Sequence, residues 1–425
     1  MSDLKIAIIG AGPAGCTLAL LLLQASVNVT IFEGEASLDA RGQGGTLDLH
    51  PKLGIAALKK LGMYEEFAKR ARYDGESFKI ANKHLECWID IGGVNEKSSR
   101  GRPEIDRAEL RDLLVTALPE GIIQWGHRLR KIDEDLTLHF DGGRDADKEE
   151  FTKSGYDLLV GADGAWSKVR PMVTPVKPYH SGVAGKRLAI NNVKETHPDL
   201  YNLVNRGSLL AFGDGNYTGA QQLGDGSLTV SAYGLAREDW AKEAEYDNAD
   251  LSAVKRMALE QRKDWSPKLR KLIEVADAET WSGNLYMMPV GLRWAHRPGI
   301  TLLGDAAHVM APFAGKGVNL AMEDAIKLSD AIVKTRDSGS KAQLANNIRA
   351  FEEDMFSRAK KTQTITNEMM QNMFFTEGAP DTNIEQFPIT VRRDWLILPL
   401  VKLIVYIVFW LRRRNIKWTP DVPYA

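Results

Sequence analysis

Three glycines and one glutamate near the start of this chain have the spacing that most clearly indicates chemistry. Gly10, Gly12 and Gly15 follow a short apolar run, and Glu33 ends a second, β-branched run. Gly10 would let the chain turn sharply as it leaves a strand, Gly12 would let a pyrophosphate approach the backbone, and Gly15 would let the next helix pack closely on the sheet. The N-terminus of that helix, at Ala14, would face the phosphates. The spacing therefore predicts a dinucleotide-binding strand–helix–strand unit.

Glu33 stands where a carboxylate can accept hydrogen bonds from an adenosine ribose, and its charge argues against a 2′-phosphate on the bound nucleotide. Because Ile6 to Leu23 carries no charge, a signal peptide or a membrane helix is the alternative interpretation of this stretch. Its three glycines and one proline make a continuous apolar helix costly. We therefore expect the nucleotide-binding unit.

The composition is that of an ordinary globular protein. The chain has 425 residues, enough for two packed domains, with 44% hydrophobic and 26% charged residues. Its formal net charge of −1 gives no indication of nucleic acid as a partner. The two cysteines, Cys16 and Cys87, lie far apart, which argues against a disulfide scaffold, a metal site and a dithiol redox centre. We expect a reducing, cytosolic setting, no metal, and a buried Cys16.

Two glycine-rich segments are expected to lie against a ligand. The segment 41–50 contains Arg41 and Asp48 as its notable polar residues, and a flexible surface loop is the alternative interpretation. A second segment follows an apolar strand pattern and reads Gly-Ala-Asp-Gly, with Asp163 as its acid. Glycines at these places would let the backbone approach a bound group closely.

A helix is expected from Pro103 through Leu118, with Arg107 and Arg111 four residues apart on one face. The guanidinium groups would reach a cofactor or its phosphates. The alternative is a basic face exposed to solvent.

A further motif follows another apolar strand pattern, at Gly304 and Asp305. Asp305 could accept a hydrogen bond from a sugar hydroxyl. The N-terminus of the long helix that follows, at Gly317 and Val318, could face an anion or an electron-rich ring. His308 lies in an apolar turn, so we expect a structural histidine and not a base.

The stretch from Trp395 to Leu411 is strongly apolar, and arginines flank it within residues 392–414. A spanning helix needs about 20 apolar residues, and Pro399 shortens the uninterrupted part. The pattern favours a helix that packs on its own protein or one that lies in a membrane surface with its arginines at the headgroups.

Taken together, these motifs resemble the single-component flavin-dependent aromatic hydroxylases, the group that includes para-hydroxybenzoate hydroxylase. The resemblance extends from residue 1 to about residue 380. It rests on three blocks in order: Gly10-x-Gly12-x-x-Gly15 with Glu33, Gly161-Ala162-Asp163-Gly164, and Gly304-Asp305 with Pro312-x-x-Gly315-x-Gly317. Within the group, the segments 44–50, 103–107 and 304–315 look like the tetracycline-inactivating monooxygenases.

The resemblance implies an α/β protein, in which a Rossmann-like FAD-binding domain carries an inserted antiparallel-sheet substrate domain and C-terminal helices. The short alternating runs from about 178 to 235 independently predict an antiparallel sheet. The expected ranges are 1–72, 101–177 and 281–340 for the FAD-binding domain, 73–100 and 178–280 for the substrate domain, 341–380 for a long bridging helix, and 381–425 for the apolar tail.

The resemblance also implies FAD as the cofactor and NADPH as a donor that binds transiently. The roles it implies are Glu33 on the adenosine ribose, Arg41 and Asp48 beside the flavin, Arg41 also toward the nicotinamide, Arg107 on the cofactor, Asp163 toward FAD and NADPH, Asp305 on the ribityl chain, and the N–H groups of Gly317 and Val318 toward the flavin ring.

The implied reaction inserts one oxygen atom from O2 into a cyclic phenol- or enol-like compound, through a hydroperoxide on the flavin. The substrate would lie between the flavin and one face of the antiparallel sheet, and the turn at Pro312, Phe313 and Gly315 would close over it. The candidates on the sheet are Arg187 and Tyr217 for catalysis, and Phe212 and Tyr233 for substrate contact. A structural role in the sheet is the alternative for each of these four residues.

The sequence departs from the tetracycline-inactivating pattern on this sheet, where Arg187, Ser208 and Thr229 stand near the places of that group's glutamine, arginine and histidine. This departure argues against tetracycline as the natural substrate. The apolar tail at residues 395–411 favours an apolar substrate, such as an aromatic polyketide or a terpenoid held near a membrane. We expect a monomer. The alternative functions are a flavin-dependent reductase or oxidase-cyclase on the same fold, and a flavoprotein that binds a ligand without turnover.

Overall fold

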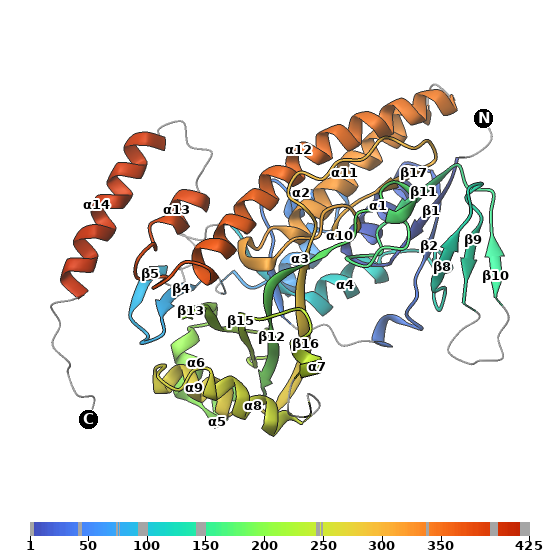
Figure 1. Ribbon diagram of the computed structural model, residues 1–425. Helices are drawn as coiled ribbons and strands as arrows, with labels where there is room; N and C mark the ends of the chain where they lie inside the picture. Colours follow the sequence, from blue (N-terminus) through green and yellow to red (C-terminus); the bar gives the residue numbers. More distant parts are fainter. Residues whose placement is uncertain are drawn as a thin grey trace. The chain divides into compact units, whose positions relative to one another are not determined.

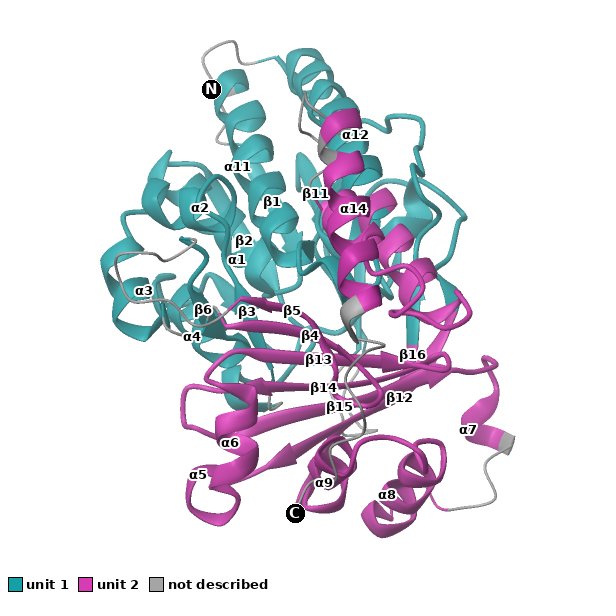
Figure 2. Ribbon diagram, turned by 90° about the vertical axis from the view of Figure 1, so that its left-hand side faces the viewer, with its two compact units in different colours: residues 1–76, 94–181, 285–363 teal, residues 77–93, 182–284, 364–425 magenta. Residues whose placement is uncertain are grey.

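The computed structural model describes residues 4–40, 45–73, 75, 77–91, 101–141, 150–243, 247, 250–336, 340–391 and 398–416 (Figure 1). The chain forms two units, each built from separate stretches of sequence (Figure 2). Unit 1 comprises residues 1–76, 94–181 and 285–363, and unit 2 comprises residues 77–93, 182–284 and 364–425.

A parallel five-stranded sheet forms the centre of unit 1, in the order β17-β11-β1-β2-β7. The apolar runs seen in the sequence become its inner strands, and Ile6, Ala7, Ile8 and Ile9 of β1 are all buried, as expected for a parallel strand covered on both faces. The strands are β1 (Lys5–Ile9), β2 (Asn28–Phe32), β7 (Ile123–Gln124), β11 (Leu158–Gly161) and β17 (Ile300–Leu302).

Helix α1 (Pro13–Gln24) connects β1 to β2 and is buried along most of its length. Because the charge-free stretch from Ile6 divides into a strand and this 12-residue helix, the alternative of one continuous apolar helix is wrong. Cys16 is fully buried, as expected, and burial raises the pKa of its thiol to about 12. Within the described ranges, every helix is too short or too polar to cross a membrane.

The other helices of unit 1 surround the same hydrophobic core, and α1 packs along α11. They are α2 (Gly54–Lys60), α3 (Tyr64–Arg70), α4 (Arg107–Thr116), α10 (Asp305–His308), α11 (Gly317–Arg336) and the first part of α12 (Lys341–Phe374). Three strands, β8 (Leu129–Ile132), β9 (Leu138–Phe140) and β10 (Phe151–Lys153), form a separate small sheet.

The helix expected from Pro103 begins later, at Arg107. The residues before it form β6 (Glu104–Asp106), which pairs antiparallel with β3 (Thr46–Asp48). Asp106 keeps an extended backbone and is the last residue before α4. The pairing with a distant segment therefore overrides the helical pattern at these three residues.

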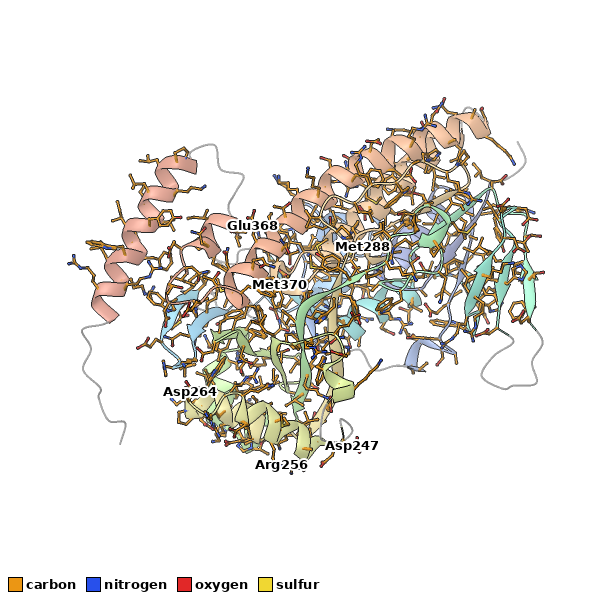
Figure 3. The ribbon with its side chains drawn as sticks, in the orientation of Figure 1. Asp247, Arg256, Asp264, Met288, Glu368 and Met370 are labelled. Atoms are coloured by element: carbon orange, nitrogen blue, oxygen red, sulfur yellow. The ribbon has the colours of Figure 1, made fainter. Side chains whose placement is uncertain are left out.

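A seven-stranded sheet forms the centre of unit 2, in the order β16-β12-β15-β14-β13-β4-β5. Strands β12 to β15 pair antiparallel, as expected, whereas β4 pairs parallel to β13. The strands are β4 (Phe78–Asn82), β5 (Cys87–Ile91), β12 (Tyr179–Ile190), β13 (Ser208–Gly213), β14 (Asn216–Gln222), β15 (Leu228–Leu235) and β16 (Ala278–Met287). The last residues of β16 already belong to unit 1, as does the next residue, Met288, which is labelled in Figure 3. The backbone N–H of Met288 donates to the carbonyl oxygen of Val309 in the same unit.

Helices cover one face of this sheet, and Figure 2 shows them together on one side. They are α5 (Val193–Thr196), α6 (Pro198–Val204), α8 (Leu251–Glu260) and α9 (Pro267–Glu274). Apolar side chains of alternate strand positions, such as Leu188, Ala220 and Val230, form a second hydrophobic core with these helices. Unit 2 also contains α7 (Trp240–Glu243), α13 (Gln386–Val391) and α14 (Leu398–Ile416).

Candidate functional site

The glycine turn after β1 has two positions that packing requires and one that is open. Gly10 has a φ of +106°, and a Cβ there would lie 2.5 Å from the carbonyl oxygen of Ala162. A Cβ on Gly15 would lie 2.1 Å from the carbonyl oxygen of Gly10. A Cβ on Gly12 would have no atom of the described residues within 4 Å. The open position is the one where the sequence predicts approach of a pyrophosphate.

The N-terminus of α1 is suited to an anion. Gly12 is the N-cap, no described side chain caps the helix there, and its first turn contains no acidic residue. Ala14 lies in that first turn and is buried. The first N–H groups of a helix have no acceptor within the helix, so they are available to phosphate oxygens.

Glu33 follows β2 and turns its carboxylate back over the glycine turn. Its Oε2 accepts a hydrogen bond from the N–H of Ala11 at 2.7 Å, and its Oε1 accepts one from the N–H of Glu35 at 2.9 Å. Each carboxylate oxygen can accept a further hydrogen bond. The orientation therefore leaves acceptors for the hydroxyl groups of a ribose.

The two arginines of α4 have different surroundings. Arg107 is exposed, and its backbone N–H donates to the carbonyl oxygen of Gly45. Arg111 is only 4% exposed, and its guanidinium donates to Glu35 at 2.5 Å and to the carbonyl oxygen of Leu38 at 3.3 Å. The alternative of a shared, solvent-exposed basic face is therefore wrong for Arg111, which stabilises the loop after β2.

Asp163, just after β11, has one carboxylate oxygen held and one without a partner. Its Oδ2 accepts hydrogen bonds from the N–H groups of Lys168 at 2.6 Å and Val169 at 3.4 Å. Its Oδ1 is buried and has no hydrogen-bond partner among the described residues. Burial raises the pKa of this carboxyl group. A buried acceptor of this kind is expected where a donor on a ligand completes the site.

Arg170, which the sequence reasoning missed, joins the two aspartate loops of unit 1. It is 3% exposed, and its guanidinium donates to the carbonyl oxygens of Ala306 at 2.7 Å, Asp305 at 3.1 Å and Gly164 at 3.4 Å. Burial lowers its pKa, against the opposing effect of Asp163 and Asp305. Its position seven residues after Asp163 was the available signal, but two of its three partners, Asp305 and Ala306, lie 135 and 136 residues away.

The turn that presents Asp305 is held from behind by Asp324 of α11. Gly304 has a φ of +58°, and its N–H donates to Asp324 at 3.1 Å. The same carboxylate lies 2.7 Å from Nε2 of His308 and accepts from Arg358 at 2.7 Å. Burial opposes ionisation of Asp324, but His308 and Arg358 lower its pKa overall. His308 is thus a buried structural residue, as expected, while the side chain of Asp305 is exposed.

Asn319 brings the end of β3 to the N-terminus of α11. Its side chain donates to the carbonyl oxygen of Asp48 at 2.8 Å and accepts from the N–H groups of His50 at 2.7 Å and Gly54 at 3.3 Å. Nearby, Gly315 has a φ of +62°, and a Cβ there would lie 3.1 Å from Oδ1 of Asp48.

The remaining candidates of unit 1 lie around this junction. Gly317 and Val318 form the first turn of α11, and a Cβ on Gly317 would meet no described atom within 4 Å. Pro312 is exposed and Phe313 is half-buried, in the short turn just before α11. Arg41 lies outside the described residues.

The four candidates on the sheet of unit 2 lie together, on the face opposite the helices. Arg187 donates to the hydroxyl of Tyr233 at 3.3 Å. The ring of Tyr217 has its centroid 5.7 Å from that of Tyr233 and 4.9 Å from that of Phe212. Burial raises the pKa of Tyr217 well above its usual value, so its hydroxyl stays protonated.

Two aromatic residues that sequence reasoning missed complete this cluster. Trp281 lies beside Arg187, 5.8 Å from guanidinium carbon to ring centroid, and 6.0 Å from Tyr233 between ring centroids. Phe374 lies 5.8 Å from Phe212 between ring centroids. They come from β16 and the end of α12, so nothing in the local pattern of β12 to β15 indicated them.

Among the described residues, no group of three or more His, Cys, Asp or Glu side chains could hold a metal ion. The candidate residues of unit 1 instead provide a helix N-terminus, backbone N–H groups and carboxylate acceptors. These are the groups that bind the phosphates and sugar hydroxyls of a dinucleotide.

Comparison with known proteins identifies the class. The family model described as "FAD binding domain" matches residues 3–346. The chain is 31% identical to monooxygenase asqM of Emericella nidulans, with 86% of this chain and 94% of that protein covered. It is 26% identical to a salicylate hydroxylase of Pseudomonas putida, with 92% of each covered. The chain therefore belongs to the FAD-binding domain family and is an FAD-dependent monooxygenase.

The solved structures agree with this fold. The crystal structure of tetracycline destructase Tet(51) matches with a TM-score of 0.67 at 17% identity, covering 99% of this chain and all of that one. At this identity the match reports the fold alone.

Proposed function

We propose that this monooxygenase uses NADPH and O2 to insert one oxygen atom into a cyclic phenol- or enol-like compound. The observation that carries the proposal is the junction at the N-terminus of α11, where Asn319 holds Asp48 beside Gly315 and the first turn of the helix. These groups serve a flavin ring and not merely its nucleotide. In this proposal unit 1 binds the cofactors and unit 2 binds the substrate.

The proposed contacts with FAD follow the geometry of unit 1. The N-terminus of α1, at Gly12 and Ala14, holds the pyrophosphate, and Glu33 accepts from the adenosine ribose. The other assignments are Asp305 to the ribityl chain, Gly317 and Val318 to the flavin ring through their N–H groups, Asp48 and Arg41 to the flavin edge, Arg107 to the cofactor, and Asp163 to both FAD and a transient NADPH.

Bound FAD would accept a hydride from the nicotinamide and supply the redox chemistry with O2. The task of the chain is to orient the substrate and to exclude water. Pro312, Phe313 and Gly315 are the proposed cover of the substrate. Gly315 is the small residue of this turn, and it would let the substrate approach the main chain closely.

The aromatic cluster of unit 2 is the proposed substrate surface. Arg187, next to the hydroxyl of Tyr233, would hold a phenolate or enolate oxygen, since a guanidinium stabilises the deprotonated form. Deprotonation makes the substrate ring more electron-rich and so more reactive toward oxygen transfer. Tyr217 stays protonated and can donate a hydrogen bond but cannot act as a base. Phe212, Tyr233 and Trp281 would stack on the substrate ring.

The enzyme is proposed to work as a monomer in a reducing compartment. The free thiols of Cys16 and Cys87 support that setting, because disulfides are rare there.

The test is a visible absorption spectrum of the purified protein, followed by addition of NADPH without air and then with air. We expect a flavin spectrum that bleaches without air and returns with it, and NADPH use that rises with phenolic substrates in step with product. Asp305→Ala should lack most of the FAD. Asp330→Ala, which changes an exposed acid of α11, should keep it.

A colourless protein that cannot be loaded with FAD would contradict the proposal, as would full FAD content in Asp305→Ala. NADPH use without an oxygenated product, for any phenolic or enolic compound tried, would favour the reductase or oxidase alternative.

A further inference from the structure

Helix α14 of unit 2 exposes a continuous apolar face. Eight of its large apolar side chains are between 42% and 58% exposed, whereas the other seven exposed large apolar residues of the described chain are scattered. At 100° per residue, Leu400, Leu403, Ile407 and Leu411 form one stripe along the helix. The full set is Leu400, Leu403, Ile404, Tyr406, Ile407, Val408, Trp410 and Leu411. Exposed apolar patches of this extent mark interaction surfaces.

The opposite side of α14 is fixed to unit 2, so the exposed face has a defined direction. Phe409 is 8% exposed, and its ring centroid lies 6.5 Å from that of Trp88. Arg412 donates to the carbonyl oxygen of Cys87 at 2.7 Å, and Arg413 donates to that of Asp381 at 2.7 Å. The helix is held by its inner side, and among the described residues its outer side remains exposed to solvent.

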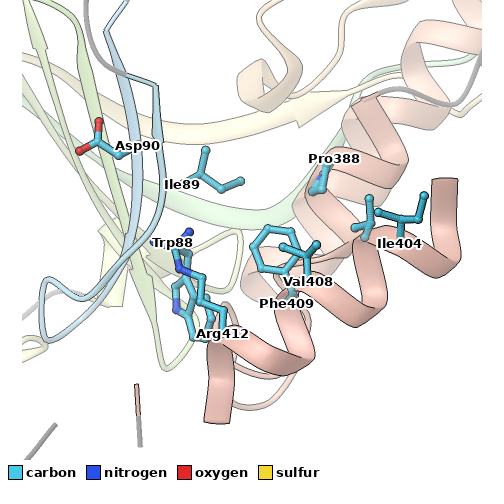
Figure 4. Close-up of a pocket in the computed structure, with 9 residues that line it drawn as sticks. Trp88, Ile89, Asp90, Pro388, Ile404, Val408, Phe409 and Arg412 are labelled. Atoms are coloured by element: carbon cyan, nitrogen blue, oxygen red, sulfur yellow. The ribbon is translucent and has the colours of Figure 1, made fainter. Parts of the chain in front are cut away.

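The inner side itself is only partly packed. An open pocket of about 360 Å³ lies between α14, α13 and β5, and its lining includes Trp88, Pro388, Ile404, Val408 and Arg412 (Figure 4). Internal packing therefore accounts for little of the apolar surface on this helix.

The charges of α14 indicate what kind of partner its apolar face would bind. The helix contains no aspartate or glutamate but has Lys402 and the run Arg412 to Arg414. Arg414 is exposed and lies 4.5 Å from the ring centroid of Trp410, measured from its guanidinium carbon. An exposed tryptophan and tyrosine next to basic residues is the composition of helices that lie in a membrane–water interface.

From these observations we propose that α14 binds the surface of an anionic lipid bilayer, with its apolar stripe in the acyl boundary and the exposed Arg414 at the headgroups. The charge complements anionic lipids. Within the described residues, α14 has no stretch that is both long enough and apolar enough to span a membrane. Membrane binding through α14 does not depend on the proposed reaction or on the identity of the substrate.

The test is flotation of the FAD-loaded protein with phosphatidylcholine vesicles, with and without phosphatidylserine. The wild type should float with the mixed vesicles, and added salt should weaken the binding. Ile407→Glu should bind at least about tenfold more weakly. Arg414→Gln should lower affinity for the mixed vesicles about fivefold. The matched control is Met257→Glu, which changes a 40% exposed apolar residue of α8 and should bind as the wild type does.

Flavin content and the thermal midpoint of each variant should equal those of the wild type, because the changed side chains are exposed. If Ile407→Glu misfolds, Leu411→Ser takes its place. Equal flotation of the stripe variants and the wild type would overturn the proposal. Failure of the wild type to bind either kind of vesicle would also overturn it. A wild-type dimer that Ile407→Glu dissociates would contradict it as well, because a second copy of the chain would then cover the stripe.

Discussion

Glu104 in β6 is a carboxyl group buried behind the end of β3. It is 8% exposed, and the nearest opposite charge is Arg72, at 3.7 Å. Burial raises its pKa from 4.5 to about 8, against the lowering effect of Arg72 and with a further increase from Asp48 and Asp106. The folded protein therefore keeps a proton on Glu104 at a pH at which the unfolded chain has released it.

The sign of the pH dependence follows from that difference. Between about pH 4.5 and 8, the folded state binds more protons at Glu104 than the unfolded state, so the free energy of unfolding falls as the pH rises. Glu104→Gln removes this titration. We predict that the wild type loses stability relative to Glu104→Gln from pH 5 to pH 8, by on the order of 2–4 kcal/mol, measured by urea unfolding.

The control is Glu66→Gln on the exposed surface of α3. Lys69 lowers the pKa of Glu66, so the titration of this group lies mostly below pH 5 and changes the stability little between pH 5 and pH 8. The free energy of unfolding of Glu66→Gln should therefore change with pH in the same way as that of the wild type. A parallel course for Glu104→Gln as well would contradict the prediction.

At this scale the sequence identified the residues that we propose to touch a ligand, and it missed the residues that hold their loops in place. Asp163 and Asp305 stand in short motifs, and a motif is local. Arg170, Asn319 and Asp324 were missed as supports, because their partners are set by the tertiary fold: Asn319 bonds to a backbone oxygen 271 residues away.

Helix α1 has two glycines with opposite sensitivities. A Cβ on Gly15 would meet the carbonyl oxygen of Gly10 at 2.1 Å, a clash with backbone that the helix cannot avoid without moving off the sheet. A Cβ on Gly12 would meet no atom of the described residues within 4 Å, and the φ of −79° at Gly12 suits any residue. Packing therefore requires a glycine at position 15 but not at position 12, where we propose that the cofactor requires it.

We predict that Gly15→Ala lowers the free energy of unfolding of the apoprotein by about 2–4 kcal/mol. Gly12→Ala should change it by less than about 1 kcal/mol but weaken FAD binding at least about tenfold. Urea unfolding of the apoprotein and FAD titration by fluorescence measure the two effects. If both variants lost stability equally, or if Gly12→Ala bound FAD normally, the open position at Gly12 would not be where the cofactor binds.

Elements with strong periodicity were predicted well, and those set by distant pairing were not. The strand–helix–strand unit of β1, α1 and β2 and the antiparallel strands β12 to β15 follow from local patterns. The strand at Glu104–Asp106 and the parallel pairing of β4 with β13 depend on partners that lie far along the chain.

The whole molecule consists of two interleaved units with separate cores. The chain passes from one to the other at residues 76–77, 93–94, 181–182, 284–285 and 363–364. One hydrophobic cluster lies in unit 1, and the other lies between the sheet and the helices of unit 2. The proposed contacts with FAD all belong to unit 1. Cofactor binding should therefore stabilise the two cores unequally.

Hydrogen exchange can test this. FAD at 100 times its Kd stabilises the state that binds it by about 2.7 kcal/mol, which corresponds to about a hundredfold slower opening of the segments it holds. We predict slower exchange on FAD addition in residues 8–18, 161–170 and 304–320, with little change in α8 and α9. Gly12→Ala supplies the control, since its fold is kept and its FAD site is weakened. Equal slowing in α8 and α9 would mean that the two cores open together as one cooperative unit, despite being built from separate side chains.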